Sequence, residues 1–184
     1  MYAGGYATGG HVAKTSWCRM EPRLPEVVPF PWINTSVPVD LSSTAESGEE
    51  HLALENIEKW TDGLRTSIER ACFANYLEKV EAIGAEPPTV PVIKRPRDIW
   101  RHIEIESVRP QGRDLIVVYA VPEWDDNLHH EWCIKGTDRL LYVGQFLDYP
   151  ADSYGDIESG NSALDYDETI ARLEHLPQQW TSNT

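Results

Sequence analysis

The sequence has little positive charge and no long apolar run. It carries 16 lysine and arginine residues against 30 aspartate and glutamate residues, a formal net charge of −14 at pH 7. A protein this acidic repels nucleic acids and anionic membranes, and it attracts basic proteins. Because no apolar stretch approaches the roughly 20 residues that a membrane helix requires, we expect no transmembrane segment. The composition therefore favours a protein partner of opposite charge.

Cysteine is scarce and irregularly spaced. The three cysteines, Cys18, Cys72 and Cys133, are odd in number and far apart, which argues against a disulfide framework. The first residues, MYAGGYATGGHVAKTSWC, combine neither a charged start nor an apolar stretch, and we therefore expect no secretory signal. Free thiols and a cytoplasmic location are the corresponding predictions.

Motifs that carry chemistry are also missing. The chain contains no G-x-x-x-x-G-K-[ST] phosphate loop, no G-x-S-x-G nucleophile elbow, no G-x-G-x-x-G fingerprint and no C-x-x-C pair. Among the histidines, His11, His51, His102 and His175 stand alone in the sequence. We therefore expect no enzymatic activity and no cofactor.

What the sequence does contain is the pattern of one α+β domain over residues 1–184. Residues 1–25 are rich in Gly, Tyr and Pro and predict a loosely ordered arm. Residues 26–147 predict the folded core. Residues 148–184 predict an acidic C-terminal extension.

The core is expected to be an antiparallel sheet of four to six strands, arranged as a meander, with one long amphipathic helix on one face. Prolines interrupt the first β-prone stretch, EVVPFPWINTSVPVDLSS, and this favours edge strands or a short hairpin. The meander begins after Pro96. Its segment at residues 115–121 is apolar on both faces, as in a central strand.

Apolar residues recur at steps of three and four over residues 49–83, the spacing of an amphipathic helix. Residues 61–63 interrupt the pattern, which predicts a kink or a division into two helices. We expect the apolar stripe to pack in the core against Val117, Tyr119 and Val143. The main members of this stripe are Leu54, Ile57, Leu64, Ile68 and Tyr76.

The densest group of polar side chains lies in EWDDNLHHEWCIKG, residues 123–136. Neighbouring residues of a strand point to opposite faces, so His130, Trp132 and Ile134 share one face. Because two of these three are large and apolar, we expect that face to point toward the core. The stretch would then form a polar hairpin rim, with its tryptophans anchored in the core.

The opposite face of this strand offers possible metal ligands. His129, Glu131 and Cys133 alternate along it, and Asp125 in the adjoining turn is a possible fourth ligand. Zinc accepts histidine, cysteine and carboxylate together. A single strand spreads its side chains in a line, however, whereas tetrahedral sites usually combine two elements. A metal site is therefore the alternative to the polar rim.

Acidic residues concentrate in two segments. Residues 45–88 hold ten acids and four bases, and residues 148–184 hold eight acids and one base. This separated layout suits a docking face. The second segment predicts a loop, followed by a short helix over residues 166–176.

We expect the loop after the meander to bind a partner, with exposed tyrosines beside acids as anchors. The alternatives are a loop that merely covers the sheet edge, and a calcium site, whose ligand spacing the segment does not match. The predicted partner-binding residues are Asp148, Tyr149, Asp152, Tyr154, Asp156 and Glu158.

The element order and the stretch YAVPEWDDNLHHEWCIKGTDRLLYVGQ resemble a bacterial family of uncharacterised domains with the hallmark W-D-x-E-H-G-x-G-V. Trp124, Asp125 and one of the two adjacent histidines match this hallmark, and Val143 with Gly144 matches the family's closing strand. The resemblance covers residues 26–147. Members look like immunity proteins encoded beside secreted antibacterial toxins, and the resemblance assigns no catalytic residues.

Three functions remain open at this point. The first is an immunity protein that binds and occludes a cognate toxin, in the simplest case a basic nuclease. The second is a metal-dependent hydrolase or metal-binding module that uses Asp125, His129, Glu131 and Cys133. The third is a non-enzymatic adaptor domain. We favour the first because occlusion needs a complementary surface and no catalytic motif.

Overall fold

The computed structural model describes six stretches of the chain and none of the arm predicted for residues 1–25. Within η2 (Ala151–Asp156), a short 3₁₀ helix, the side chains of Ala151 and Asp152 are not described. The described residues are 26–41, 49–84, 90–125, 129–148, 151–158 and 160–177.

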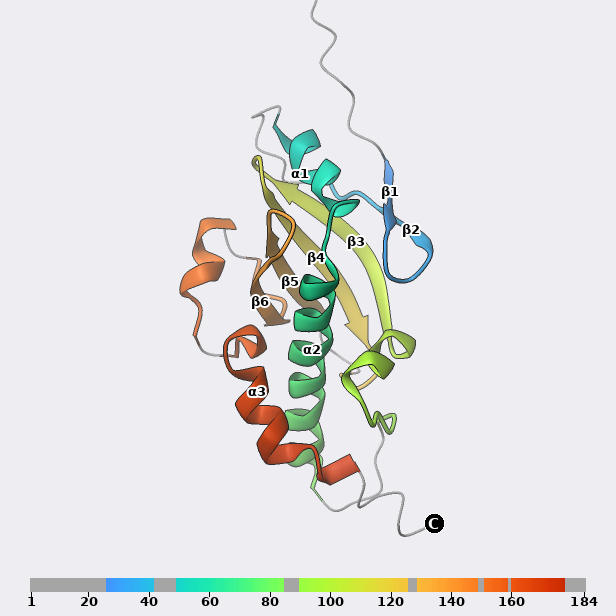
Figure 1. Ribbon diagram of the computed structural model, residues 1–184, viewed down its shortest axis with the longest axis vertical. Coiled ribbons are helices and arrows are strands. Elements are labelled where there is room, and N and C mark those ends of the chain that lie inside the picture. Colours follow the sequence, from blue (N-terminus) through green and yellow to red (C-terminus); the bar gives the residue numbers. More distant parts are fainter. Residues whose placement is uncertain are drawn as a thin grey trace, which may run out of the picture.

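The main sheet is an antiparallel meander of four strands, within the range that the sequence predicts (Figure 1). Its strands are β3 (Ile103–Gln111), β4 (Leu115–Pro122), β5 (His130–Lys135) and β6 (Arg139–Gln145), and each pairs with the next in sequence. A short 3₁₀ helix, η1 (Pro96–Arg101), precedes β3, where the sequence pattern had suggested only the start of the meander. The α+β class is confirmed.

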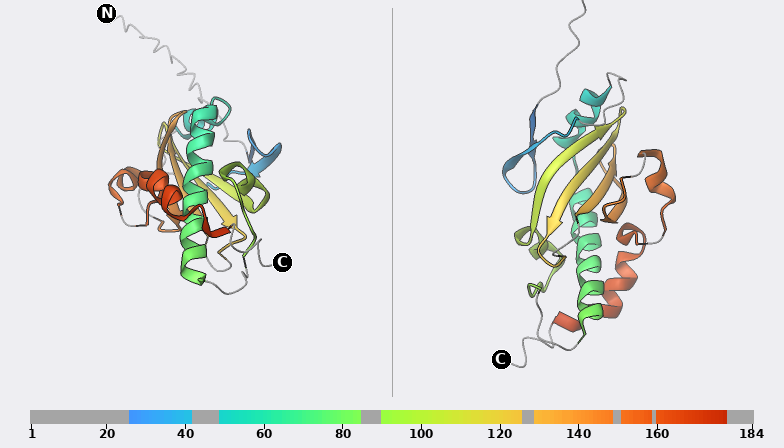
Figure 2. Two further views of the ribbon diagram at one scale, coloured as in Figure 1. Left: turned by 60° about the horizontal axis from the view of Figure 1, so that its bottom comes forward. Right: turned by 180° about the vertical axis from the view of Figure 1, so that it is seen from behind.

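The proline-interrupted stretch forms a separate two-stranded hairpin. In it β1 (Val27–Phe30) pairs with β2 (Thr35–Pro38), as the prolines predict. Just after β2, Val39 forms a parallel bridge with Val108 of β3. The hairpin is thus attached to the β3 edge of the main sheet (Figure 2).

The long helical pattern is divided in two. The first part is α1 (Glu50–Ile57) and the second is α2 (Asp62–Ile83). Thr61 is the N-cap of α2, and its side-chain oxygen accepts a hydrogen bond from the backbone N–H of Leu64 at 3.1 Å. The division therefore falls at the interruption that the sequence shows.

The α-helices that the structure describes lie on one face of the main sheet. Figure 1 shows α2 lying across this face, with α3 (Ser162–Leu173) packed along α2. No helix in the described stretches is long and apolar enough to cross a membrane. From behind, Figure 2 shows the opposite face without a covering helix layer. We call the two faces the helix face and the outer face.

The apolar stripe of the helices is buried, and one part of the prediction about its partners is wrong. The five stripe residues lie in the same core cluster as Val143. Val117 and Tyr119 instead belong to a second cluster on the outer face, with Cys133 and Tyr142. The sequence misleads here because β4 is apolar on both faces, so its pattern does not mark which residues meet the helix.

The start of α3 protects the free edge of β6. Asn161, the N-cap of α3, is buried, and its side-chain oxygen accepts from the N–H groups of Val143 and Ala163. Its amide nitrogen donates to the carbonyl oxygens of Leu141 and Ile157. One side chain therefore caps a helix and satisfies edge groups of a strand.

A close approach of two backbones requires glycine at the same edge. A Cβ atom at Gly144 would lie 2.4 Å from the carbonyl oxygen of Gly160, closer than nonbonded atoms allow. The Val143-Gly144 pair of the sequence motif therefore has a structural role, with Val143 in the core and Gly144 against the segment that enters α3.

Truncating the buried stripe should destabilise the protein. Leu64 is 1% exposed, and Leu64→Ala should reduce the free energy of unfolding by ~2–5 kcal/mol, because it leaves a cavity in the core. Urea denaturation measures the difference. Leu164→Ala is the matched control, since Leu164 is 59% exposed, and it should change stability by about 0.5 kcal/mol or less. Equal effects of the two substitutions would contradict the assignment.

Candidate binding site

The polar stretch at the β4–β5 connection separates into groups on different faces of the sheet. Asp125 contacts His130, while His129 contacts Glu106 of β3. Glu131 lies on the same outer face as His129, as the sequence predicts, but it is fully buried and hydrogen-bonds to Tyr154 instead. The four-residue metal cluster that the sequence suggested does not form. Among the described residues, no three His, Cys, Asp or Glu side chains are grouped so as to hold a metal ion.

On the helix face, the tryptophan-aspartate part of the motif attaches the β4–β5 connection to α2. The indole N–H of buried Trp124 donates to the Asn75 side chain at 3.1 Å. Asp125 accepts from Lys79 at 3.1 Å and lies 3.2 Å from Nε2 of His130. As the sequence predicts, His130 and Trp132 face the core with Ile134, and Trp132 is fully buried.

His130 is kept neutral by its surroundings. Burial lowers the pKa of its imidazole, and the hydrogen bond to Asp125 opposes this effect only in part. A neutral imidazole can still donate from Nε2 to Asp125, so the contact does not require a charged ring. The group is thus a structural link rather than a surface for a ligand.

On the outer face, Glu131 is a fully buried carboxylate with three donors. Its oxygens accept from the backbone N–H groups of Leu147 at 3.0 Å and Asp148 at 3.3 Å, and from the hydroxyl of Tyr154 at 2.7 Å. All three partners donate, which is the arrangement that suits an ionised carboxylate. Glu131 therefore fixes the chain after β6 across the outer face.

This contact corrects the prediction for Tyr154. The sequence pattern indicated an exposed aromatic anchor, but Tyr154 is fully buried, and its ring packs 5.5 Å from that of Tyr142. It covers the sheet, as the alternative interpretation of the loop proposed. Cys133 lies in the same cluster, and burial raises the pKa of its thiol to about 12. Such a thiol is a packing group and a poor nucleophile.

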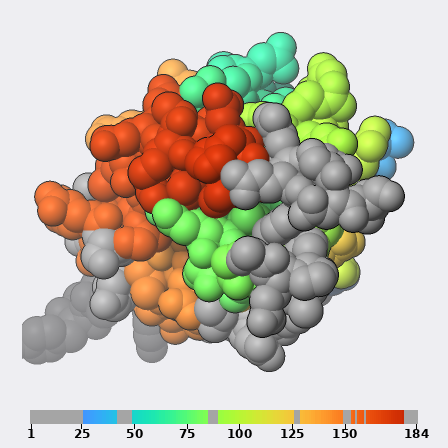
Figure 3. All heavy atoms as spheres, turned by 90° about the horizontal axis from the view of Figure 1, so that it is seen from below, coloured from blue at the N-terminus to red at the C-terminus, as the bar shows by residue number. Residues whose placement is uncertain are grey.

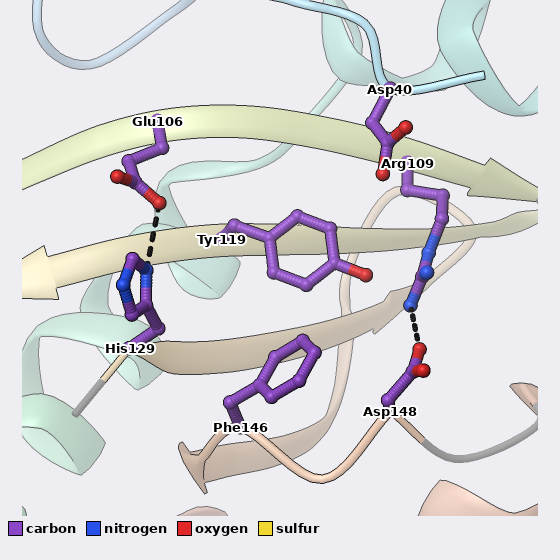
Figure 4. Close-up of a pocket in the computed structure, with 7 residues that line it drawn as sticks. All are labelled: Asp40, Glu106, Arg109, Tyr119, His129, Phe146 and Asp148. Atoms are coloured by element: carbon purple, nitrogen blue, oxygen red, sulfur yellow. Dashed lines mark hydrogen bonds and ion pairs between the residues drawn. The ribbon is translucent and has the colours of Figure 1, made fainter. Parts of the chain in front are cut away.

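Beside this covered region lies an open pocket of about 440 Å³ (Figure 4). It is bounded by strands β3 and β4, by the start of β5, and by the chain just after β6. Its volume lies in the range of ligand sites in proteins. The residues that line it are Asp40, Glu106, Arg109, Tyr119, His129, Phe146 and Asp148.

A β-bulge arranges the β3 side of the pocket. Ile105 pairs with Ala120 and Ser107 pairs with Tyr119, which leaves Glu106 as the additional residue. The bulge shifts the alternation of β3 by one position, so Val108 enters the helix-face core and Arg109 turns to the outer face. Without this shift, Arg109 would point into the apolar core.

Arg109 and Tyr119 form the floor of the pocket. The Arg109 guanidinium lies 4.9 Å from the centroid of the Tyr119 ring and donates to Asp148 at 3.1 Å. Both residues are more than nine-tenths buried, with 6% and 8% exposure. Neither Nε of Arg109 nor the Tyr119 hydroxyl has a hydrogen-bond partner among the described residues. Burial raises the pKa of Tyr119, so its hydroxyl stays protonated.

The remaining lining residues make the pocket aromatic and negative. Figure 4 shows Tyr119 between the Glu106–His129 pair on one side and Arg109 with Asp148 on the other. The Phe146 ring is 5.7 Å from that of Tyr119, and Phe146 is 45% exposed. The three carboxylates of Asp40, Glu106 and Asp148 outnumber the one guanidinium. A positively charged group is therefore the better electrostatic match.

The predicted partner-binding residues lie in different environments in the structure. Asp148 lines the pocket, and Asp156 and Glu158 are exposed. Tyr149 and the side chain of Asp152 lie outside the described residues. Sequence reasoning missed the pocket residues of β3 and β4, since nothing in their strand pattern separates a pocket tyrosine from a core tyrosine.

Comparison with known proteins shows the family of the chain. Residues 10–150 match the family described as Domain of unknown function (DUF6985), and the chain belongs to this family. The matched region contains the main sheet, α1, α2 and the residues that line the pocket. No curated protein and no solved structure gives a significant match.

Replacing Glu131 by glutamine should loosen the chain after β6. Glutamine retains one acceptor oxygen and turns an NH₂ group toward a donor, so Glu131→Gln should cost ~1–3 kcal/mol of unfolding free energy. Amide hydrogen exchange at Leu147 and Asp148 should become faster. Tyr154→Phe, which removes one donor only, should have a smaller effect on both amides. Unchanged exchange in Glu131→Gln would show that the carboxylate does not fix this chain.

His130 should make the stability depend on pH. The unfolded chain takes up a proton near the ordinary histidine pKa of 6.5, whereas the folded imidazole binds one only at lower pH. Stability should therefore fall as the pH is lowered through about 6.5, with a slope of at most ~1.4 kcal/mol per pH unit from this group. His130→Gln should reduce the slope. An equal slope in the variant and the unmodified chain would refute this.

Proposed function

We propose that the chain is a non-catalytic binding protein, and specifically an immunity protein that occludes a basic, secreted antibacterial toxin. The observation that carries this proposal is the open outer-face pocket, in which three carboxylates surround two aromatic rings. Aromatic rings supply contact area at an interface, and the carboxylates supply charge complementary to a basic partner. The resemblance of the Trp124-Asp125 motif to immunity-like domains points in the same direction.

Further exposed acids follow the pocket residue Asp148 along the chain. Asp148 has a side chain that is 61% exposed, and Asp156 and Glu158 are exposed in the segment that follows. Figure 3 shows this segment on one face of the molecule with α3 and the end of α2. There, burial raises the pKa of Glu78, and the neighbouring Asp165 adds to this effect while Arg172 opposes it. A field of negative charge speeds the encounter with a basic protein.

Occlusion of a partner requires no catalytic residue in this chain. It requires a surface that matches the active site of the partner, whereas the polar residues of the β4–β5 connection are engaged in holding the fold together. A bacterial origin and a cytoplasmic location belong to this proposal, because an immunity protein acts inside the cell that it protects.

Charge neutralisation tests this function. The chain with Asp148→Asn, Asp156→Asn and Glu158→Gln should associate with the toxin encoded beside it ~10-fold more slowly at low salt, because steering is weakened. The difference should disappear near 1 M salt, where charges are screened beyond about 3 Å. Stopped-flow fluorescence across a salt series measures the rates.

The matched control removes the same number of charges elsewhere. Glu104→Gln, Asp114→Asn and Asp138→Asn change exposed acids of the meander, and this variant should keep most of the association rate. If both triple variants slow association equally, only overall charge matters and the segment after β6 is not the docking face. If the neighbouring toxin does not bind the unmodified chain, the immunity function is wrong.

A further inference from the structure

We propose that the outer-face pocket binds the charged end of one lysine or arginine side chain from a protein partner. The site would be formed by the rings of Tyr119 and Phe146 and the carboxylates of Glu106 and Asp148. The inference deepens the proposed function, because it names the chemical group by which a basic partner is held. The pocket itself can be tested without that partner.

The protein already holds one guanidinium in this way. Arg109 lies over the Tyr119 ring at 4.9 Å and pairs with Asp148 at 3.1 Å. A ring face and a carboxylate are the two elements that bind a cation in proteins. On the other side of Tyr119, Glu106 pairs with His129 at 2.8 Å, and the exposed Phe146 ring lies 5.7 Å from the Tyr119 ring between centroids (Figure 4). The pocket thus places a further carboxylate and a further aromatic ring beside the guanidinium that it already holds.

The charge of the pocket decides between a cation and an anion. Arg109 alone could attract an anion, but its charge is already offset by Asp148, and Glu106 adds a further carboxylate to the pocket. An anionic ligand would therefore meet net repulsion. A cation entering beside Glu106 reduces the excess of negative charge.

Two carboxylates have capacity for such a ligand. Glu106 uses Oε2 to contact His129 at 2.8 Å, and Asp148 uses Oδ1 to accept from Arg109. Their side chains are 43% and 61% exposed, so the second oxygen of each can meet an incoming N–H group. Both are acceptors, which fits the donor-only chemistry of lysine and arginine.

The floor of the pocket provides an independent indication of a ligand. Tyr119 is 8% exposed, and its hydroxyl has no hydrogen-bond partner among the described residues. A buried polar group without a partner is costly and rare in native proteins. Because the phenol stays protonated, its oxygen retains lone pairs that can accept from an ammonium or guanidinium group. Figure 4 shows this hydroxyl pointing toward Arg109, on the Asp148 side of the pocket.

The direct test uses a small cation as the probe. N-acetyl-arginine amide carries the guanidinium and no other charge, and N-acetyl-citrulline amide is its neutral analogue of nearly the same shape. Titration of each into the ¹⁵N-labelled full chain should shift the amide signals of Glu106, Tyr119 and Phe146 for the arginine compound only. We expect a dissociation constant of ~1–10 mM, the affinity of a single small contact.

Variants locate the binding. Glu106→Gln and Phe146→Ala should each weaken binding of the arginine compound by ~5-fold or more, and both residues are exposed enough for the fold to tolerate the change. Glu104→Gln on the same strand and Leu164→Ala on α3 are the matched controls, and they should change binding less than ~2-fold. The amide spectrum of each variant verifies that it is folded.

Several outcomes would overturn the pocket assignment. These are equal shifts with the citrulline compound, no shift at the pocket residues, shifts centred on α3 instead, or equal weakening by the control variants. Failure of the proposed function would look different, because the pocket would bind arginine while the neighbouring toxin did not bind the chain. A toxin that bound Glu106→Gln and Phe146→Ala as tightly as the unmodified chain would refute the anchor and leave the immunity function standing.

Discussion

A buried carboxylate organises the outer face. Glu131 has no exposure to solvent, and a charge in that position is tolerated only when its oxygens accept hydrogen bonds. The donors come from the chain that follows β6, at Leu147, Asp148 and Tyr154. Meeting this requirement brings Asp148 to Arg109 and sets Phe146 beside Tyr119. The position of the chain that closes the pocket therefore depends on the hydrogen bonds required by one glutamate near the start of β5.

Adjacent residues of β5 have different structural roles because they lie on opposite faces of the sheet. His130 points to the helix face, where Asp125 and Lys79 join the β4–β5 connection to α2. Glu131, one residue later, points to the outer face. Because adjacent residues of a strand point to opposite faces, the two networks lie on opposite sides of the sheet. A substitution in one network therefore does not remove a contact of the other. Residues that looked like one metal cluster in the sequence belong to two structural systems.

The sequence contained enough information to predict the helix face but too little for the outer face. The stripe from Leu54 to Tyr76 repeats with helical spacing, and such a period predicts both the helices and what they bury. Val117 and Tyr119 were assigned to the wrong face because β4 is apolar throughout. The turn of Arg109 toward the pocket depends on a bulge at Glu106, which moves the core-facing positions of β3 from Ile103 and Ile105 to Val108. The interpretation of the sequence followed a single alternation along this strand and did not include the bulge.

The acidic extension illustrates why charge composition alone does not identify a docking surface. Aromatic residues beside acids looked like anchors, yet Tyr154 is fully buried, because Glu131 in the sheet needs its hydroxyl. Asp148 has an intermediate role, since it pairs with Arg109 while most of its side chain stays exposed. Among the predicted anchors whose side chains the structure describes, Asp156 and Glu158 are exposed and lie outside the pocket. A partner that uses this face would thus meet outer acids that attract it first, and then a carboxylate and aromatic rings whose positions the fold has already set.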